Sequence, residues 1–252
     1  MASSSAARRI GCAAAAASLI PLLGGCHIQS AATQERSSQT TTGTNSTPDG
    51  DRSNVQDISR LLDQVGIVKN EPPSVPGYDL ECGRSHGCVF GPRWTDNHDA
   101  DGGHDGCGTR DNVLARQLSS VTFKPGTNGC VVIAGHFTDP YSGEVVHFTK
   151  EKAAEVPVDH IYSRRRAWDM GAYRWPQHKR VRFANDPRNL VATTRAANSS
   201  KQDAGLTWLP DADKCGHTAR YLRVAVAYDL PITTREHRMA RLVISSCSGE
   251  QP

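Results

Sequence analysis

Three short polar segments in the second half of the chain carry side chains suited to acid–base and metal chemistry. The first contains Asp159 and His160, the second Asn189, and the third Asn198 and Lys201. Because an imidazole titrates near neutral pH, His160 is a candidate general base. The oxygen atoms of Asp159 and Asn198 suit one divalent ion, Mg²⁺ or Mn²⁺, better than zinc. Lys201, three residues after Asn198 on the same helix face, is predicted to contact phosphate. An activated water beside such an ion is what phosphodiester hydrolysis needs.

The Asp159-His160 pair raises a geometric question, because adjacent side chains of a regular strand point to opposite faces. Both can serve one site only where the strand ends or is distorted, and the following Tyr162-Ser163-Arg164 segment favours a strand end. The alternative is a buried, structural His160 paired with Asp159, which would be favoured if the pair stood alone. The two further polar segments downstream favour the catalytic interpretation.

The order and spacing of the three segments resemble the HNH, or ββα-metal, nucleases. The branch whose third motif residue is Asn, as in the HNH domain of RNA-guided CRISPR nucleases, fits best. The C-terminal HNH domain of GmrSD-type restriction endonucleases and its small secreted actinobacterial relatives are more similar still. Two positions depart from that group: Ile161 is followed by Tyr162 where relatives often have a Pro, and Gln202 replaces a Gly. The resemblance spans residues 85–247 and includes segments 90–94, 106–111, 129–132, 139–143, 183–186 and 208–210.

This resemblance implies a fold and an activity. It implies an α+β fold with a ββα-metal HNH core at residues 155–203, embedded in a disulfide-stapled domain with an N-terminal β-hairpin region and C-terminal helices. Asp159 and Asn198 would hold the ion, His160 would deprotonate water, and Asn189 would brace the loop that orients this base. We expect a monomeric endonuclease that cleaves DNA and leaves a 5′-phosphate. Sequence preference should be low, since the sequence contains no separate recognition domain.

Two other functions remain open. A degenerate HNH fold could act as a non-catalytic, nucleic-acid-binding lipoprotein at the cell surface. Alternatively, the enzyme could cleave RNA. No feature of the sequence recognises a 2′-hydroxyl group, so the sequence does not exclude an RNA substrate.

The periodicity of apolar residues and the turn residues predict the elements that position these segments. A capping box from Thr233 to Glu236 opens a helix that ends near Cys247. Strands precede helices along the domain, which is the pattern of an α+β protein. The other predicted elements are helices at 109–118 and 217–229 and strands at 121–124, 130–134, 144–149 and 156–161.

A basic stretch directly follows the candidate base. Residues 164–182 hold seven basic residues and only Asp169 as an acid, although the whole chain has a net charge of just +3. The stretch includes Trp168 and Trp175, so we predict a groove that follows phosphates, with a solvated basic face as the alternative. The predicted nucleic-acid contacts are Lys201, Arg164, Arg165, Arg166, Lys179 and Arg180.

The N-terminal segment predicts export. Two arginines precede an uncharged run from Ile10 to Leu23, which is too short to span a bilayer and is typical of a signal peptide. The residues around Cys26 resemble a bacterial lipobox, so Cys26 is predicted to carry a lipid that anchors the protein to the outer face of the cell membrane. An ordinary secretory signal is the alternative. We expect a signal peptide at 1–25, a flexible tether with a short helix at 26–77 and the nuclease domain at 78–252.

The chain contains eight cysteines. Without Cys12 in the signal peptide and Cys26 at the lipobox, six remain, and in an oxidising compartment they predict three disulfides. Six cysteines allow many connectivities, and sequence alone does not select one. We favour sequential pairing of these cysteines. A zinc site is the alternative, but the chain has no CxxC pair, which argues against it. The favoured pairs are Cys82–Cys88, Cys107–Cys130 and Cys215–Cys247.

Overall fold

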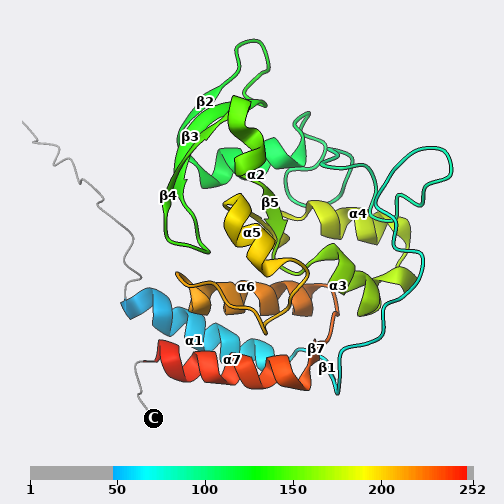
Figure 1. Cartoon of the computed structure of the whole chain (residues 1–252), viewed down its shortest axis with the longest axis vertical. Coiled ribbons are helices and arrows are strands. Elements are labelled where there is room, and N and C mark those ends of the chain that lie inside the picture. Colours follow the sequence, from blue (N-terminus) through cyan, green and yellow to red (C-terminus); the bar gives the residue numbers. More distant parts are fainter. Residues whose placement is uncertain (1–47, 249–252) are drawn as a thin grey trace, which may run out of the picture. The chain divides into compact units, whose positions relative to one another are not determined.

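A computed structural model describes residues 48–248 (Figure 1). The predicted signal peptide, the lipidation site Cys26 and most of the predicted tether lie outside the described residues. No helix within 48–248 is long and apolar enough to cross a membrane. The helices are α1 (Pro48–Leu62), α2 (Thr109–Gln117), α3 (Arg164–Asp169), α4 (Gln177–Asn185), α5 (Arg195–Lys201), α6 (Lys214–Ala227) and α7 (Thr234–Cys247), with 3-10 helices η1 (Lys150–Glu155), η2 (Ala172–Arg174) and η3 (Pro187–Asn189).

The strands form three small sheets. Strands β2 (Ser119–Phe123), β3 (Val132–Thr138) and β4 (Val145–Thr149) make an antiparallel sheet. Strands β5 (Val158–His160) and β6 (Leu190–Ala192) pair antiparallel, and β1 (Ile67–Val68) pairs parallel with β7 (Ile232–Thr233). In chain order the hairpin region follows α1 and α2 and precedes the other helices, and β5, β6 and α5 supply the two strands and the helix of a ββα unit. The predicted α+β class is therefore confirmed.

Helices α1, α6 and α7 pack against one another below the ββα unit in the view of Figure 1. Helix α1 is amphipathic, and its Ile58 and Leu61 are buried in the main hydrophobic core. Helix α7 contributes to the same hydrophobic core through its contacts with α1 and α6. Burial of such apolar faces is the main favourable contribution to this layer.

The segment after α1 belongs to the folded unit and corrects the predicted tether. Strand β1 pairs with β7, the Glu71 carboxylate forms an ion pair with Arg166, and the Val75 amide donates to Asp169 at 2.7 Å. The expected boundary at residue 78 is therefore too late. Ser, Pro and Gly residues around 71–77 suggested a linker, but long-range contacts order them.

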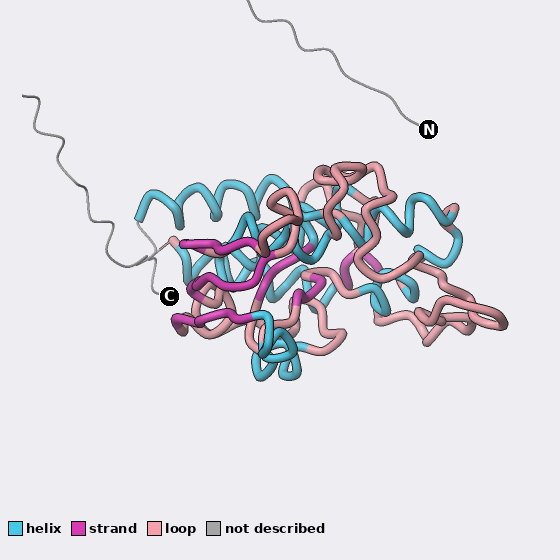
Figure 2. Tube along the Cα trace, turned by 90° about the horizontal axis from the view of Figure 1, so that it is seen from above, coloured by secondary structure: helices cyan, strands magenta, loops and turns pink. Residues whose placement is uncertain are grey.

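The three disulfides have the sequential pairing that the sequence favoured. Cys215–Cys247 joins the start of α6 to the end of α7, whose N-terminus has the predicted capping box of Thr233 and Glu236. Residues 69–108 contain no helix or strand and form the long loops visible in Figure 2. Cys82–Cys88 closes a short loop within this irregular stretch.

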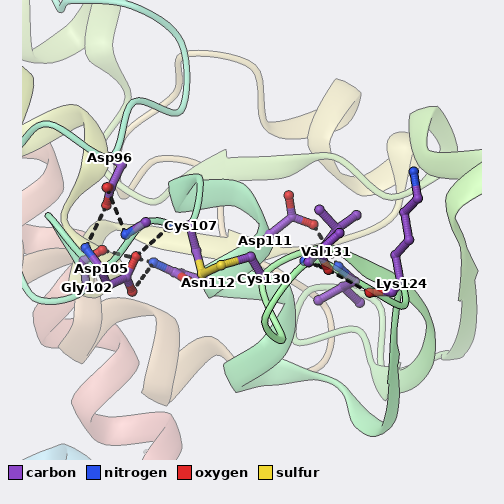
Figure 3. The surroundings of a disulfide bond; sticks show 12 residues. Asp96, Gly102, Asp105, Cys107, Asp111, Asn112, Lys124, Cys130 and Val131 are labelled. Carbon is purple, nitrogen blue, oxygen red and sulfur yellow. Dashed lines mark hydrogen bonds between the residues drawn. A yellow bond between two sulfur atoms is a disulfide. The ribbon is translucent and has the colours of Figure 1, made fainter. Parts of the chain in front are cut away.

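The Cys107–Cys130 disulfide ties the loop that enters α2 to the turn between β2 and β3 (Figure 3). Beside it, the Asp96 carboxylate accepts hydrogen bonds from the Asp105 and Gly106 amides, both at 3.0 Å. Helix α2 then contacts β6. The side-chain amide of Gln117 donates to the Leu190 carbonyl and accepts from the Ala192 amide, on both sides of Val191. This chain of contacts links a surface loop to the ββα unit.

Candidate active site

The candidate site is built on the β5–β6 pair. Asp159 lies opposite Val191 and His160 lies opposite Leu190 in the antiparallel register. His160 is the last residue of β5, so the strand ends at the Asp-His pair as its chemistry requires. This end allows both side chains to line one cavity of about 440 Å³.

Asn189 holds the chain that leaves β5. Its side-chain oxygen accepts from the Tyr162 amide at 2.8 Å, and its amide nitrogen donates to the Tyr162 carbonyl at 3.1 Å. Its own carbonyl accepts from the Ile161 amide at 2.8 Å. The side chain is fully buried, so these bonds are shielded from water. Asn189 therefore fixes the backbone directly after His160 and contacts the loop that the family resemblance assigns to it.

His160 is held in one orientation. Its Nε2 lies 2.9 Å from the Ala184 carbonyl oxygen. A carbonyl only accepts, so Nε2 carries the hydrogen and Nδ1 keeps its lone pair. The ring stacks on Trp94 at 5.8 Å between centroids and 12° between planes. Burial lowers the pKa of His160 well below its ordinary value, and the nearby Arg164 charge lowers it further. The imidazole is consequently neutral at neutral pH.

Asp159 is restrained through one of its oxygens. Oδ2 accepts from the Tyr141 hydroxyl at 2.8 Å and lies 3.0 Å from the Lys201 ammonium. Burial raises the pKa of Asp159, while the Lys201 charge opposes that rise. Neither of these contacts uses Oδ1.

Lys201 corrects a sequence prediction. Its side chain is fully buried, and besides Asp159 its ammonium contacts the His160 carbonyl at 2.9 Å. Helix α5 turns Lys201 inward beneath β5, so it cannot reach a phosphate at the surface. The predicted phosphate contact is wrong, and Lys201 instead restrains the backbone and carboxylate of the Asp-His pair.

Asn198 lies on the wall of the same cavity as Asp159 and His160. The cavity therefore brings together a carboxylate and an amide, both hard oxygen donors. Within residues 48–248, no three His, Cys, Asp or Glu side chains gather in a way that could hold a metal. One carboxylate with an amide and several waters nevertheless fits Mg²⁺, which keeps much of its hydration shell in proteins.

Most of the basic stretch does not reach this cavity. Arg164 lines it, with a guanidinium whose pKa is lowered by burial. Arg165 pairs with Asp169 at 2.8 Å, and Arg166 is buried against Glu236 at 2.5 Å.

The other two predicted contacts of the stretch lie on α4. The Arg180 guanidinium donates to the carbonyls of Val89 and Trp175, and the Lys179 ammonium lies 4.4 Å over the Trp175 ring. The Arg180 contact with Val89 holds α4 against the irregular loop, whereas the Lys179 contact with Trp175 is local to the start of α4. Of the predicted groove along residues 164–182, the structure therefore brings only Arg164 to the cavity of Asp159 and His160.

Sequence reasoning missed several side chains around the cavity. Arg93 and Trp94 come from the irregular loop. Arg110 of α2 also lines the cavity, and its charge was already a candidate addition to the predicted groove. Tyr141 comes from the turn between β3 and β4. The segments 90–94 and 139–143 stood out only as resemblances, because nothing local shows that they reach the Asp-His pair.

Comparisons with known proteins give one matching family and one similar protein. The family model described as "GmrSD restriction endonucleases, C-terminal domain" matches residues 108–240, more than half of the chain, including β5, β6 and α5. An uncharacterized secreted protein of Arthroderma benhamiae is 31% identical over 146 residues, covering 56% of this chain and 68% of that protein. No solved structure matches the chain.

Proposed function

Because the chain belongs to the family of C-terminal domains of GmrSD restriction endonucleases, we propose that it is a metal-dependent endonuclease that hydrolyses phosphodiester bonds in DNA. The observation that carries this proposal is that His160, a base whose pKa is lowered by burial, lines the same cavity as Asp159 and Asn198. A proton acceptor beside two hard oxygen donors is the minimum equipment for this hydrolysis.

In the proposed mechanism, His160 Nδ1 takes a proton from the attacking water. The Ala184 carbonyl fixes the tautomer of His160, and Trp94 fixes the plane of its ring. Asn189 fixes the backbone that follows His160. Arg164 provides positive charge toward the phosphate.

Asp159 and Asn198 are the residues proposed to hold one Mg²⁺ or Mn²⁺. When bound, this ion would neutralise negative charge on the phosphate and on the leaving 3′ oxygen. Water would add to phosphorus and the bond to the 3′ oxygen would break, which leaves a 5′-phosphate and a 3′-hydroxyl. Tyr141 and Lys201 would keep the Asp159 carboxylate in place through Oδ2.

We also propose that the protein works outside the cytoplasm. Three disulfides join six cysteines of residues 48–248, and such bonds persist in oxidising compartments. The similar Arthroderma benhamiae protein is named as secreted. Lipid attachment at Cys26, which would tether the enzyme to the outer face of the membrane, remains part of this proposal.

The decisive experiment is plasmid nicking by the purified protein, with His160→Ala and His160→Asn compared with wild type. Removing a general base should slow cleavage by about 10²–10⁴-fold. His147→Ala is the matched control, since His147 is exposed on β4 and outside the cavity. Folding of each variant is checked by thermal unfolding. If folded His160 variants nick DNA at the wild-type rate, the catalytic assignment is wrong.

The metal and the substrate are tested in the same assay. EDTA should stop nicking, and added Mg²⁺ or Mn²⁺ should restore it. Titration calorimetry with Mn²⁺ alone gives an independent measurement, because Asp159→Asn and Asn198→Ala should each weaken Mn²⁺ binding. Parallel assays on DNA and RNA of equal length distinguish the two substrates.

A further inference from the structure

A second cavity of about 540 Å³ adjoins the candidate active site. The two cavities share Arg93, Trp94, Arg110, Pro157 and Asn198 in their walls, so they form one continuous groove. The second cavity extends past Asn198 toward the exposed start of α5, away from His160, which does not line it. The groove therefore continues beyond the place where the reaction would occur.

This second cavity carries positive charge without compensation. Its walls include Arg93, Arg110 and Arg195 and no carboxylate. Neither Arg93 nor Arg195 forms an ion pair with any other residue of 48–248, and both side chains are exposed. An anionic ligand is the natural complement of such a surface.

The arginines are held in place by neutral groups. Arg110 donates to the carbonyls of Ala153 at 3.0 Å and Val156 at 2.7 Å, and Arg195 donates to the carbonyl of Ala154 at 2.8 Å. Carbonyl acceptors orient a guanidinium without neutralising it. The η1 segment thus aligns two cations along the groove and leaves their charge available.

Trp94 lines both cavities. Its backbone has φ +53°, a conformation that bulky residues rarely adopt, and its carbonyl accepts from the Thr109 amide at 3.3 Å. The same indole stacks on His160. One side chain therefore borders both the candidate base and the second cavity.

We infer that the second cavity binds the phosphate backbone of the nucleic-acid strand next to the cleaved phosphate, with Arg93 and Arg195 as the contacting cations. This inference rests on the proposed function, since it assigns the route by which the substrate strand leaves the reacting centre. Arg93, Arg110 and Arg195 come from three separate segments of the chain, and all three line this second cavity.

The test measures binding without cleavage. The full mature chain carrying His160→Ala is titrated in EDTA against a fluorescein-labelled 20-nucleotide single strand, and anisotropy gives Kd at several salt concentrations. Arg93→Gln and Arg195→Gln are each added to that background. Arg238→Gln is the matched control, because Arg238 is exposed on α7 and lines neither cavity.

Each groove substitution should weaken binding by about tenfold, the value of one charge-assisted hydrogen bond. Each should also reduce the slope of log K against log salt by about 0.7, the change expected for one lost phosphate contact on a single strand. Arg238→Gln should change neither quantity. Thermal unfolding of each variant verifies that its fold is retained.

Two results would overturn the inference, and they differ in meaning. If the His160→Ala protein binds the strand but the folded Arg93 and Arg195 variants bind equally well with unchanged slope, the groove assignment is wrong while the proposed function stands. If the parent protein binds no nucleic acid and the wild type nicks none, the proposed function and the groove assignment both fail.

Discussion

Arg165 and Arg166 sit in the most basic stretch of the sequence, and each has a carboxylate partner within the protein. Arg93 and Arg195 are isolated in the sequence, and neither has such a partner within the described residues. The first pair joins α3 to other parts of the fold, whereas the second pair lies along the groove beside His160. Density of positive charge along a chain therefore does not by itself identify a binding surface, because carboxylates of the same fold can pair with it. Our proposal places the nucleic acid on charge that the fold leaves uncompensated.

The contrast has a simple physical origin. A guanidinium has five donors in a rigid plane, so it can join several elements at once and is suited to scaffolding. Arg166 contacts Glu236, Glu71 and the Tyr221 hydroxyl in this way. Burial of such a cluster requires that every charge be paired, which removes it from any role in binding a polyanion.

The largest effect is expected for Arg166→Met, which tests whether an arginine with a carboxylate partner stabilises the fold and does not bind nucleic acid. The substitution leaves the buried Glu236 carboxylate without its cation, so the free energy of unfolding should fall by about 3–5 kcal/mol. Urea denaturation at pH 7 measures the change. A variant of wild-type stability with weaker affinity for DNA would instead place Arg166 in the binding surface.

A smaller effect is expected for Arg180→Met. Its guanidinium donates to two backbone carbonyls, Val89 at 2.6 Å and Trp175, and the methionine can still cover part of Trp168. Losing these bonds should lower the free energy of unfolding by about 1–2 kcal/mol. The affinity for the 20-nucleotide strand should match that of the parent. Weaker binding with unchanged stability would contradict the scaffold interpretation.

The smallest effect concerns Arg188 and depends on pH. Burial raises the pKa of Asp186, but hydrogen bonds from Arg188 and Tyr228 outweigh it, so the net pKa lies below the ordinary 3.8. A carboxyl with a lowered pKa contributes stability above pH 3.8 that is lost as pH falls below it.

Arg188 is largely exposed, so Arg188→Gln should lower stability at pH 7 by only about 0.5 kcal/mol. The difference between wild type and variant should shrink as pH falls below 3.8 and through the lowered pKa of Asp186 in the folded wild type. Urea midpoints measured from pH 7 downward record this. A difference that stays constant over the whole acid range would show that Arg188 acts by packing and not by charge.

Local sequence signals predicted much of the fold. The helix from Thr109, the strands of the hairpin region and the capping box at Thr233 all depend on neighbours within a few residues, and all are present. The sequential disulfides also follow the favoured pairing. In contrast, the packing of β1 against β7 depends on residues more than 160 positions apart, so a polar, proline-rich stretch was mistaken for a tether.

The residues of the candidate site also divide into those that the sequence predicted and those that only the tertiary structure brings there. Asp159, His160, Asn189 and Asn198 could be identified because their types and order carry the chemistry. The direction of Lys201 could not, since helical spacing places it beside Asn198 without showing that α5 packs it inward. Tyr141 and Trp94 reach the site only through tertiary contacts, which no local pattern reports.

The packing of α1 has a practical meaning for dissecting this protein. A shortened chain beginning at Tyr78 would lack Ile58, Leu61 and the strand that pairs with β7. The apolar faces of α6 and α7 would then meet water, and a newly exposed apolar patch of this kind promotes self-association. The smallest fragment worth expressing therefore starts upstream of α1, even though every residue assigned to catalysis lies more than ninety positions later.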